Sequence, residues 1–205
     1  MSLSQESYLE GISELARIDD DLGRVVRNLG NPPLWSRDPG FPTLIHIILE
    51  QQVSLASARA AYFKLTDLVC QLTPERFLEI GDAELREIGF SRQKSAYCRG
   101  LSKAILRGEL DIKELGGLDD NTVRTRLMQV KGIGPWTADI YLLMALLRPD
   151  VWPAGDLAIA KAVQRIKGLA SRPSPEILSK IAEPWRPWRA LAARILWHYY
   201  LNGDE

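Results

Sequence analysis

Apolar residues recur every three or four positions along almost the whole chain, which is the spacing of amphipathic helices. No stretch alternates apolar and polar residues over the length that a half-buried strand requires. Breaks in the pattern carry helix start signals at Thr73-Pro74, Gly81-Asp82, Ser91, Asp119 or Asp120, Ser174-Pro175 and Pro187. The sequence therefore predicts an all-α fold of about ten to twelve helices.

Two segments rich in turn-forming residues, 30–40 and 148–155, interrupt the helical pattern. A length of 205 residues fits one domain or two small lobes. We expect the chain, residues 1–205, to be a single module of two helical lobes with an active-site cleft between them. Lobe A is expected over about residues 1–39 and 148–205, and lobe B over about residues 40–147.

The composition is that of an ordinary globular protein, with 46% hydrophobic and 25% charged residues. Cys70 and Cys98 lie in helical patterns and are expected to be reduced, partly buried thiols; two cysteines cannot form a four-cysteine metal site. His46 and His198 lack a partner at metal-ligand spacing, so we expect structural roles. The N-terminus does not resemble a signal peptide, and the longest apolar run, 140–147, is too short to span a membrane.

Charge is distributed unevenly on a chain whose net charge is zero. Acidic residues are concentrated within residues 6–21, whereas basic residues are concentrated within residues 86–107 and 186–194. A zero net charge argues against binding nucleic acid through overall charge alone. A basic stretch can be part of a DNA-binding face or an ordinary solvated helix surface, and both interpretations stay open at this point.

The most informative stretch is residues 127–139, where one helix ends, Gly132-Ile133-Gly134 form a tight turn, and Pro135 begins the next helix. Two glycines permit backbone angles that other residues resist and leave the amides uncovered. These amides and the following helix N-terminus can bind one phosphate without reading base sequence. A two-glycine turn is also a common structural connection, so the turn alone is weak evidence.

The full pattern resembles the helix-hairpin-helix motif of DNA-repair enzymes, at about residues 120–147, because valine and lysine precede the turn and P-W-T-A follows it. The resemblance implies DNA contacts at Lys131, Gly132, Ile133, Gly134 and Thr137. It also implies that a sodium or potassium ion can bind the main-chain carbonyls of Met128, Val130 and Ile133. Noncatalytic DNA-binding modules contain the same hairpin, so the motif indicates DNA binding rather than catalysis.

Beyond the hairpin, a Gly/Pro-rich loop leads to Asp156, an order that resembles the helix-hairpin-helix-Gly/Pro-Asp glycosylase superfamily, in which this aspartate is catalytic. Asp156 also fits an ordinary N-cap, since it follows Gly155 and precedes a helix. The two roles are compatible, because a helix N-terminus stabilises a carboxylate. Such a carboxylate stabilises positive charge on the deoxyribose as the glycosidic bond breaks, and it can orient or deprotonate water.

Three further segments resemble the 3-methyladenine DNA glycosylase II family: Q-Q-x-S at 51–54, G-x-S-x-x-K-x-x-Y at 89–97 and W-x-P-W-R at 185–189. The resemblance covers roughly residues 30–200 and implies the compact form without the extra N-terminal sheet domain. By this alignment, Gln52 fills the gap left by a flipped base, and Gln51 and Ser54 also face the DNA. A pair of helix-capping glutamines is the alternative interpretation.

Trp136 stands where bifunctional relatives carry a lysine that forms a Schiff base. The resemblance therefore implies a monofunctional enzyme without strong lyase activity. Lys131 is the nearest other amine, but its place in the hairpin favours phosphate contact or solvation.

Trp136, Trp197, Tyr141 and Trp35 are the candidates for an aromatic base pocket. A purine alkylated on a ring nitrogen is cationic, so it stacks favourably on aromatic faces. Packing in the core is the alternative for the tryptophans. Where the family has an aromatic residue one turn into the hairpin's second helix, this chain has Ile140, with Tyr141 beside it.

These observations predict a base-excision-repair glycosylase that flips alkylated purines, of the 3-methyladenine and 7-methylguanine type, out of duplex DNA and hydrolyses their N-glycosidic bond. We expect a monomer that needs no redox or organic cofactor, binds damaged duplex DNA and does not bind membranes. A cytoplasmic location is expected, with the nucleoid in a bacterium or the nucleus in a eukaryote. The alternatives are a glycosylase for oxidised, deaminated or mismatched bases, and a noncatalytic helix-hairpin-helix DNA-binding protein.

Overall fold

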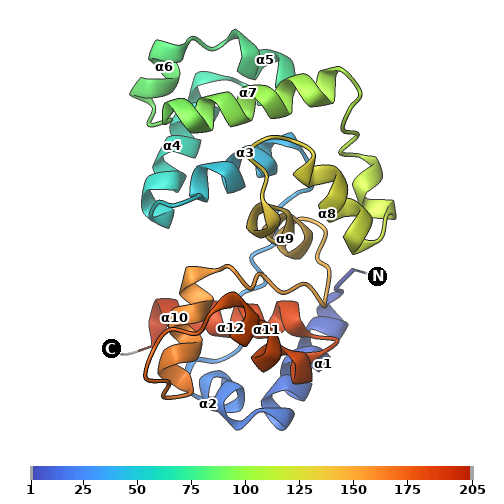
Figure 1. Ribbon diagram of the computed structural model, residues 1–205, viewed down its shortest axis with the longest axis vertical. Coiled ribbons are helices and arrows are strands. Elements are labelled where there is room, and N and C mark those ends of the chain that lie inside the picture. Colours follow the sequence, from blue (N-terminus) through green and yellow to red (C-terminus); the bar gives the residue numbers. More distant parts are fainter. Residues whose placement is uncertain (1, 204–205) are drawn as a thin grey trace. The chain divides into compact units, whose positions relative to one another are not determined.

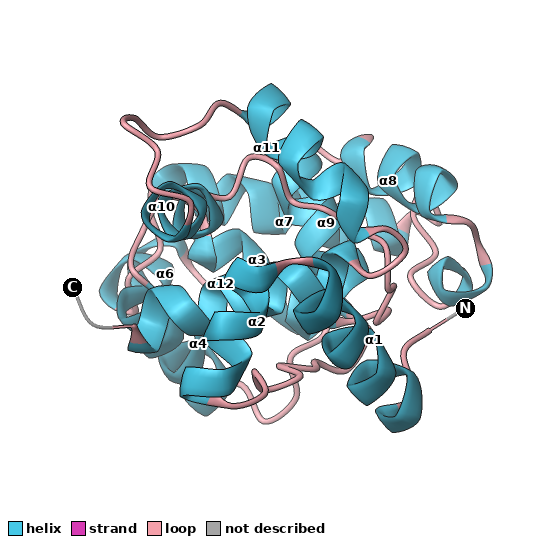
Figure 2. Cartoon of the chain, turned by 90° about the horizontal axis from the view of Figure 1, so that it is seen from below, coloured by secondary structure: helices cyan, strands magenta, loops and turns pink. Residues whose placement is uncertain are grey.

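The computed structural model describes residues 2–203. These residues form helices joined by loops, and no strand occurs among them (Figure 2). The predicted all-α fold is therefore confirmed, with twelve α-helices and two short 3₁₀ helices in the described part. None of these helices is both long enough and apolar enough to cross a membrane.

The helices divide into two compact units, which Figure 1 shows in sequence colours. Unit 1 comprises the chain up to Ser36 and from Leu142 onward, and unit 2 comprises Arg37–Tyr141. The expected lobe boundaries lie near residues 39 and 147, and the second boundary of the structure falls instead inside a helix. Turn-forming residues mark where a helix ends, whereas packing decides where a compact unit ends.

Unit 1 is organised around its last helix, α12. This helix packs against α1, α2 and α10, and its residues from Ala190 to Trp197 are all buried. A helix that is buried all round lies in the core of its unit. The helices of unit 1 are α1 (Gln5–Ile18), α2 (Asp20–Leu29), α10 (Leu157–Ile166), α11 (Pro175–Ala182), the 3₁₀ helix η2 (Glu183–Trp185) and α12 (Arg189–Asn202).

Arg194 lies in the middle of this buried run and is 0% exposed. Its guanidinium donates hydrogen bonds to the carbonyls of Leu34 at 2.7 Å, Leu143 at 2.7 Å and Ala190 at 3.0 Å. Burial lowers the pKa of Arg194 to about 10. The side chain thus fixes the end of the loop after α2 against α12, because a buried donor that lost these acceptors would be costly.

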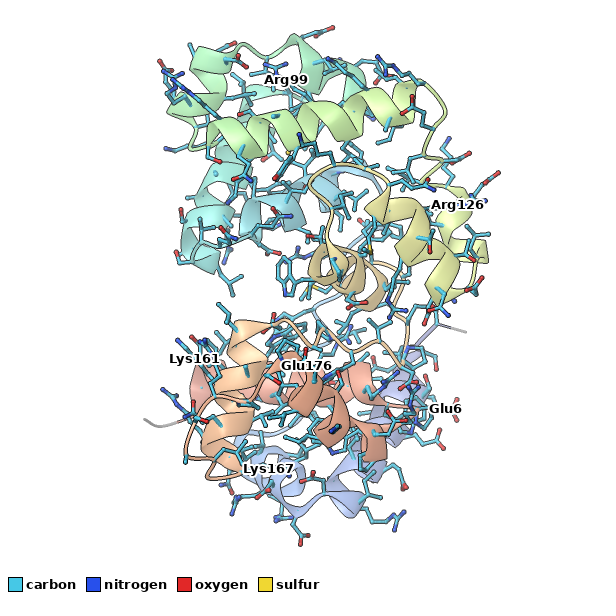
Figure 3. The ribbon with its side chains drawn as sticks, in the orientation of Figure 1. Glu6, Arg99, Arg126, Lys161, Lys167 and Glu176 are labelled. Carbon is cyan, nitrogen blue, oxygen red and sulfur yellow. The ribbon has the colours of Figure 1, made fainter. Side chains whose placement is uncertain are left out.

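Unit 1 is also held by an ion-pair cluster between the start of α2 and the end of α10. Lys167, which Figure 3 labels, follows the end of α10. Its Nζ lies 3.0 Å from carboxylate oxygens of both Asp19 and Asp21. The indole of Trp185 donates to Asp19 at 3.0 Å. Asp19 in turn caps α2, so one carboxylate connects three segments of this unit.

Unit 2 is organised around α7, which packs against α3, α5 and α6. Helix α7 buries Cys98 and Leu101, and burial raises the pKa of the Cys98 thiol. Helix α9 begins in unit 2 and continues into unit 1. The helices are α3 (Phe41–Glu50), α4 (Leu55–Leu68), α5 (Pro74–Glu79), α6 (Asp82–Glu87), α7 (Arg92–Leu106), the 3₁₀ helix η1 (Glu114–Gly117), α8 (Asp120–Met128) and α9 (Pro135–Met144).

Most helix starts lie where the sequence places them, because the side chains that cap them do so by local hydrogen bonds. Thr73, Ser91, Asp119 and Ser174 each accept a hydrogen bond from a backbone amide in the first turn of their helices. Pro187 is the exception. The last helix begins at Arg189, since the Trp188 amide donates first to the Trp185 carbonyl in a preceding turn, at 2.7 Å.

Cys70 departs from the expectation of a partly buried thiol. It is exposed, because α4 ends at Leu68 and the chain turns there at the surface. His46 stacks on the ring of Tyr62, with centroids 4.2 Å apart. The Nε2 of His198 lies 3.1 Å from the carbonyl oxygen of Leu29. Both imidazoles thus have packing or hydrogen-bonding partners within their own unit.

Candidate active site

Asp156 caps the N-terminus of α10 and is only 7% exposed. Its Oδ1 accepts a hydrogen bond from the amide of Ile159 at 2.9 Å and another from the indole Nε1 of Trp197 at 3.2 Å. The first bond is the N-cap contact expected from the sequence. The second comes from a residue 41 positions away, so α12 orients the carboxylate as well.

Trp197 is itself supported by Trp35, in the loop after α2. The two rings meet edge to face, with centroids 6.4 Å apart and planes at 71°, a favoured arrangement for aromatic pairs. Trp35 has a φ of 47°, which is uncommon for a bulky residue and marks local strain. Unit 1 thus brings Asp156, Trp197 and Trp35 into one contiguous group.

The hairpin is built from α8, the turn at residues 129–134 and α9. The Ile133 amide donates to the Val130 carbonyl at 3.0 Å within the turn. The Nε of Arg124 on α8 donates to the carboxylate of Asp139 on α9 at 2.6 Å, which ties the two helices together. A carbonyl has two lone pairs, so the Val130 oxygen keeps acceptor capacity beyond this internal bond.

The two glycines of the turn have different reasons to be glycine. Gly132 has a φ of 99°, and a Cβ there would lie 2.2 Å from a ring carbon of Tyr97. A Cβ on Gly134 would meet nothing within 4 Å. Packing therefore requires Gly132, whereas at Gly134 a side chain would only fill open space over the turn. The idea that glycine keeps the amides uncovered thus applies to Gly134.

Gln51 and Thr137, expected among the DNA contacts, have partners inside unit 2. The Gln51 Nε2 donates to the carbonyl of Gly132 and to the Oγ1 of Thr137, both at 2.9 Å. Thr137 is buried, and Gln51 is half-buried. These two side chains therefore support the hairpin from within, and the sequence motif could not distinguish this role from surface contact.

Gln52 and Ser54 lie in the turn between α3 and α4 and are exposed. Gln52 has a φ of 57°, another uncommon value for a residue other than glycine. Ser54 caps α4 by accepting from the Ser57 amide at 3.2 Å. The turn thus presents Gln52 at the surface in a constrained backbone conformation.

Tyr141, expected in the base pocket, is 0% exposed and has a structural partner. Its hydroxyl accepts a 3.1 Å hydrogen bond from the amide of Gly40, the residue that precedes α3. Burial raises the pKa of Tyr141 to about 12. Trp136, by contrast, is partly exposed in the first turn of α9, and Lys131 is exposed in the hairpin turn. Tyr141 thus supports α3, and Trp136 is the more accessible of these two rings.

Comparison with known proteins adds to this geometry. Residues 45–187 match the HhH-GPD superfamily base excision DNA repair protein family. The chain therefore belongs to the HhH-GPD superfamily of base excision DNA repair proteins.

Two relatives and one solved structure with the name 3-methyladenine DNA glycosylase are similar to this chain. DNA-3-methyladenine glycosylase 1 of Schizosaccharomyces pombe is 30% identical over 191 residues, which are 89% of this chain and 83% of the relative. Putative DNA-3-methyladenine glycosylase YfjP of Bacillus subtilis is 29% identical over 165 residues, and the match spans 58% of that longer protein. The solved structure of S. pombe 3-methyladenine DNA glycosylase (Mag1) in complex with abasic DNA has a TM-score of 0.90 at 28% identity, covering 96% of this chain and 98% of that one.

Proposed function

We propose that this protein is a base-excision-repair glycosylase that hydrolyses the N-glycosidic bond of alkylated purines in duplex DNA. The observation that carries the proposal is the buried carboxylate of Asp156, held by the Ile159 amide and the Trp197 indole in a chain of this superfamily. The names of the relatives support 3-methyladenine as a substrate. We add 7-methylguanine, because it is also a purine made cationic by alkylation of a ring nitrogen.

Asp156 acts on the sugar in this proposal. As the glycosidic bond breaks, positive charge grows on the deoxyribose, and a fixed carboxylate nearby stabilises it. The same group can orient the attacking water or accept its proton. Two donors on Oδ1 hold the carboxylate before the substrate arrives, and the N-terminus of α10 favours its negative charge.

The DNA is held at two turns of unit 2. The hairpin turn binds a backbone phosphate through its amides and the N-terminus of α9, with Gly134 leaving room and Lys131 adding charge. Exposed Gln52 fills the gap that the flipped base leaves in the stack. Neither contact reads base sequence, as suits an enzyme that searches for damage in any context.

Trp35 and Trp197, which lie beside Asp156 in unit 1, supply the aromatic surface for the flipped base. A ring-alkylated purine is cationic and gains about 0.5–2 kcal/mol on an aromatic face. Such a base also leaves without strong acid assistance, which fits a site with one assigned carboxylate. Because the ring of Trp136 replaces an amine, the reaction ends at hydrolysis, with the DNA strand intact.

The test uses duplex DNA treated with a methylating agent, incubated with the purified chain. We expect free methylpurines, identified by mass, and strands that stay unbroken until alkali cleaves the abasic sites. Strand cleavage without alkali, or a protein–DNA adduct trapped by borohydride, would argue for a bifunctional enzyme. Binding without base release would favour the noncatalytic alternative.

Loss of the indole donor should slow the reaction while the fold stays intact. Trp197→Phe removes the hydrogen bond to Asp156 and keeps most of the ring, so we expect a base-release rate about tenfold lower, the effect of roughly 1.4 kcal/mol. Trp152→Phe is the matched control, because the Trp152 Nε1 is buried with no hydrogen-bond partner in the described part of the chain. Equal rates for the two variants in single-turnover assays would contradict the orienting role of Trp197.

We also propose that the main-chain carbonyls of Met128, Val130 and Ile133 bind a sodium or potassium ion, since these hard cations prefer oxygen ligands. Met128 ends α8, and Val130 and Ile133 lie in the turn that follows it. Such an ion would add positive charge beside the bound phosphate. Replacing potassium by a bulky organic cation at constant ionic strength should then weaken duplex binding several-fold. Unchanged affinity would remove the ion from the proposal.

We further propose that the protein acts as a monomer. We also propose that it is located in the compartment that contains the genomic DNA of the cell.

A further inference from the structure

The G-x-S-x-x-K-x-x-Y motif at residues 89–97 has no part in the chemistry proposed above. Gly89 has a φ of 107°, and Ser91 caps α7 by accepting a hydrogen bond from the Lys94 amide at 3.2 Å. These two residues account for the start of a helix. The side chains of the lysine and the tyrosine are not needed for that purpose, so they require another explanation.

The Lys94 side chain reaches a second helix. Its Nζ donates a 2.6 Å hydrogen bond to the carbonyl of Leu49 in the last turn of α3, where carbonyls lack intrahelical partners. A cation in the first turn of α7 is unfavourable at that helix's own N-terminus, and burial lowers the pKa of Lys94. The contact with Leu49 offsets both costs, because carbonyls at a helix C-terminus stabilise an ammonium group.

Tyr97 follows one turn later, on the same face of α7 as Lys94. Its ring lies against the backbone of Gly132, since a Cβ built there would be 2.2 Å from the Tyr97 Cγ. The Tyr97 hydroxyl accepts a 2.6 Å hydrogen bond from Gln93, which helps to fix the ring. One face of α7 therefore contacts both the end of α3 and the hairpin turn.

Gln51 links the same two places directly. It follows α3, and its amide donates to Gly132 and Thr137 of the hairpin. The next residue along the chain is Gln52, at the surface of the α3–α4 turn. The contacts of Lys94, Tyr97 and Gln51 all lie within unit 2 and thus connect its two exposed turns, and Figure 1 shows α3 and α7 side by side in that unit.

We propose that Lys94, Tyr97 and Gln51 are positioning residues. They hold the turn that carries Gln52 and the hairpin turn at a fixed distance and orientation relative to each other. A flipped nucleotide can then be replaced by Gln52 only while the neighbouring phosphate sits on the hairpin. The three side chains themselves do not touch the DNA. This inference rests on the proposed function, because only there do both turns bind DNA.

Lys94→Met tests the inference, since methionine keeps the buried stem and removes the donor. We expect affinity for a duplex containing an abasic-site analogue to fall about tenfold, the effect of one charge-assisted hydrogen bond. Lys94→Arg keeps a donor and should stay near wild type. Lys103→Met, an exposed site on the same helix, controls for the lost charge. The slope of log Kd against log salt should be unchanged, whereas loss of a direct phosphate contact would lower it by about one.

A double-mutant cycle with Gln52→Ala gives the sharper test. If Lys94 acts by positioning Gln52, the double variant should bind no more than about twofold more weakly than the weaker single variant. The inference would be overturned if the affinity loss of the double variant equalled the product of the losses of the two single variants. A smaller slope of log Kd against log salt for Lys94→Met would also overturn it. If Lys94→Met does not fold, Tyr97→Leu takes its place in the cycle. A wild-type chain that fails to bind abasic duplex DNA would instead contradict the proposed function.

Discussion

Replacing Asp156 with asparagine is expected to slow base release by on the order of a thousandfold while leaving the protein folded. The amide oxygen of asparagine can still accept the hydrogen bonds from Ile159 and Trp197, and asparagine caps helices as well as aspartate does. Only the negative charge is lost. Single-turnover release of methylpurines at saturating enzyme measures the chemical step, and thermal unfolding checks the fold.

Asp119→Asn is the matched control for this variant. Asp119 also caps a helix, accepting from the amides of Asn121 and Thr122, but it is exposed at the position before α8. Its substitution should leave the rate within about twofold of wild type. If Asp156→Asn kept more than a tenth of the wild-type rate, Asp156 would be a helix cap without a catalytic role.

Among substitutions that add one methyl group to the hairpin turn, Gly132→Ala should lower the free energy of unfolding the most. The new Cβ would overlap the Tyr97 ring, and a φ of 99° is strained for alanine. Overpacking costs about 1–3 kcal/mol and the strained backbone about 1–3 kcal/mol, so we expect a loss of roughly 3 kcal/mol in the free energy of unfolding. At this chain length, that lowers Tm by about 6–12 °C.

Gly134→Ala separates this packing requirement from DNA contact. A methyl group there meets no protein atom within 4 Å, so Tm should change little, while duplex affinity falls because the methyl group covers the turn. Tyr97→Ala combined with Gly132→Ala should recover part of the lost stability, since the overlap is gone and only the strained backbone remains. Equal Tm values for Gly132→Ala and Gly134→Ala would show that Tyr97 does not restrict the hairpin.

The helices were predictable because their signals are local. A cap such as Thr73 or Ser91 needs only the amides of its own first turn, and the apolar spacing needs only neighbouring turns. The boundary of the two units was not predictable in the same way. It falls within α9, where no turn-forming residue marks it, because it depends on contacts between distant segments.

In the candidate site, too, local features were predictable from the sequence and contacts between distant residues were not. The order of hairpin, loop and Asp156 is visible in the sequence, but the bond from Trp197 spans 41 positions and is not. Of the adjacent Gln51 and Gln52, the sequence cannot tell which side chain turns inward. Tyr141 was grouped with the pocket because it is aromatic, and its bond to Gly40 became visible only in three dimensions.

The central claim is that this chain removes alkylated purines by means of Asp156. Its most direct test is a set of otherwise identical duplexes that each carry 7-methylguanine, hypoxanthine, 8-oxoguanine or uracil, incubated with wild type and with Asp156→Asn. The account predicts release of 7-methylguanine fastest by wild type, because that base is cationic, with near loss in the variant. Preferential release of 8-oxoguanine or uracil, or equal release by both proteins, would contradict it.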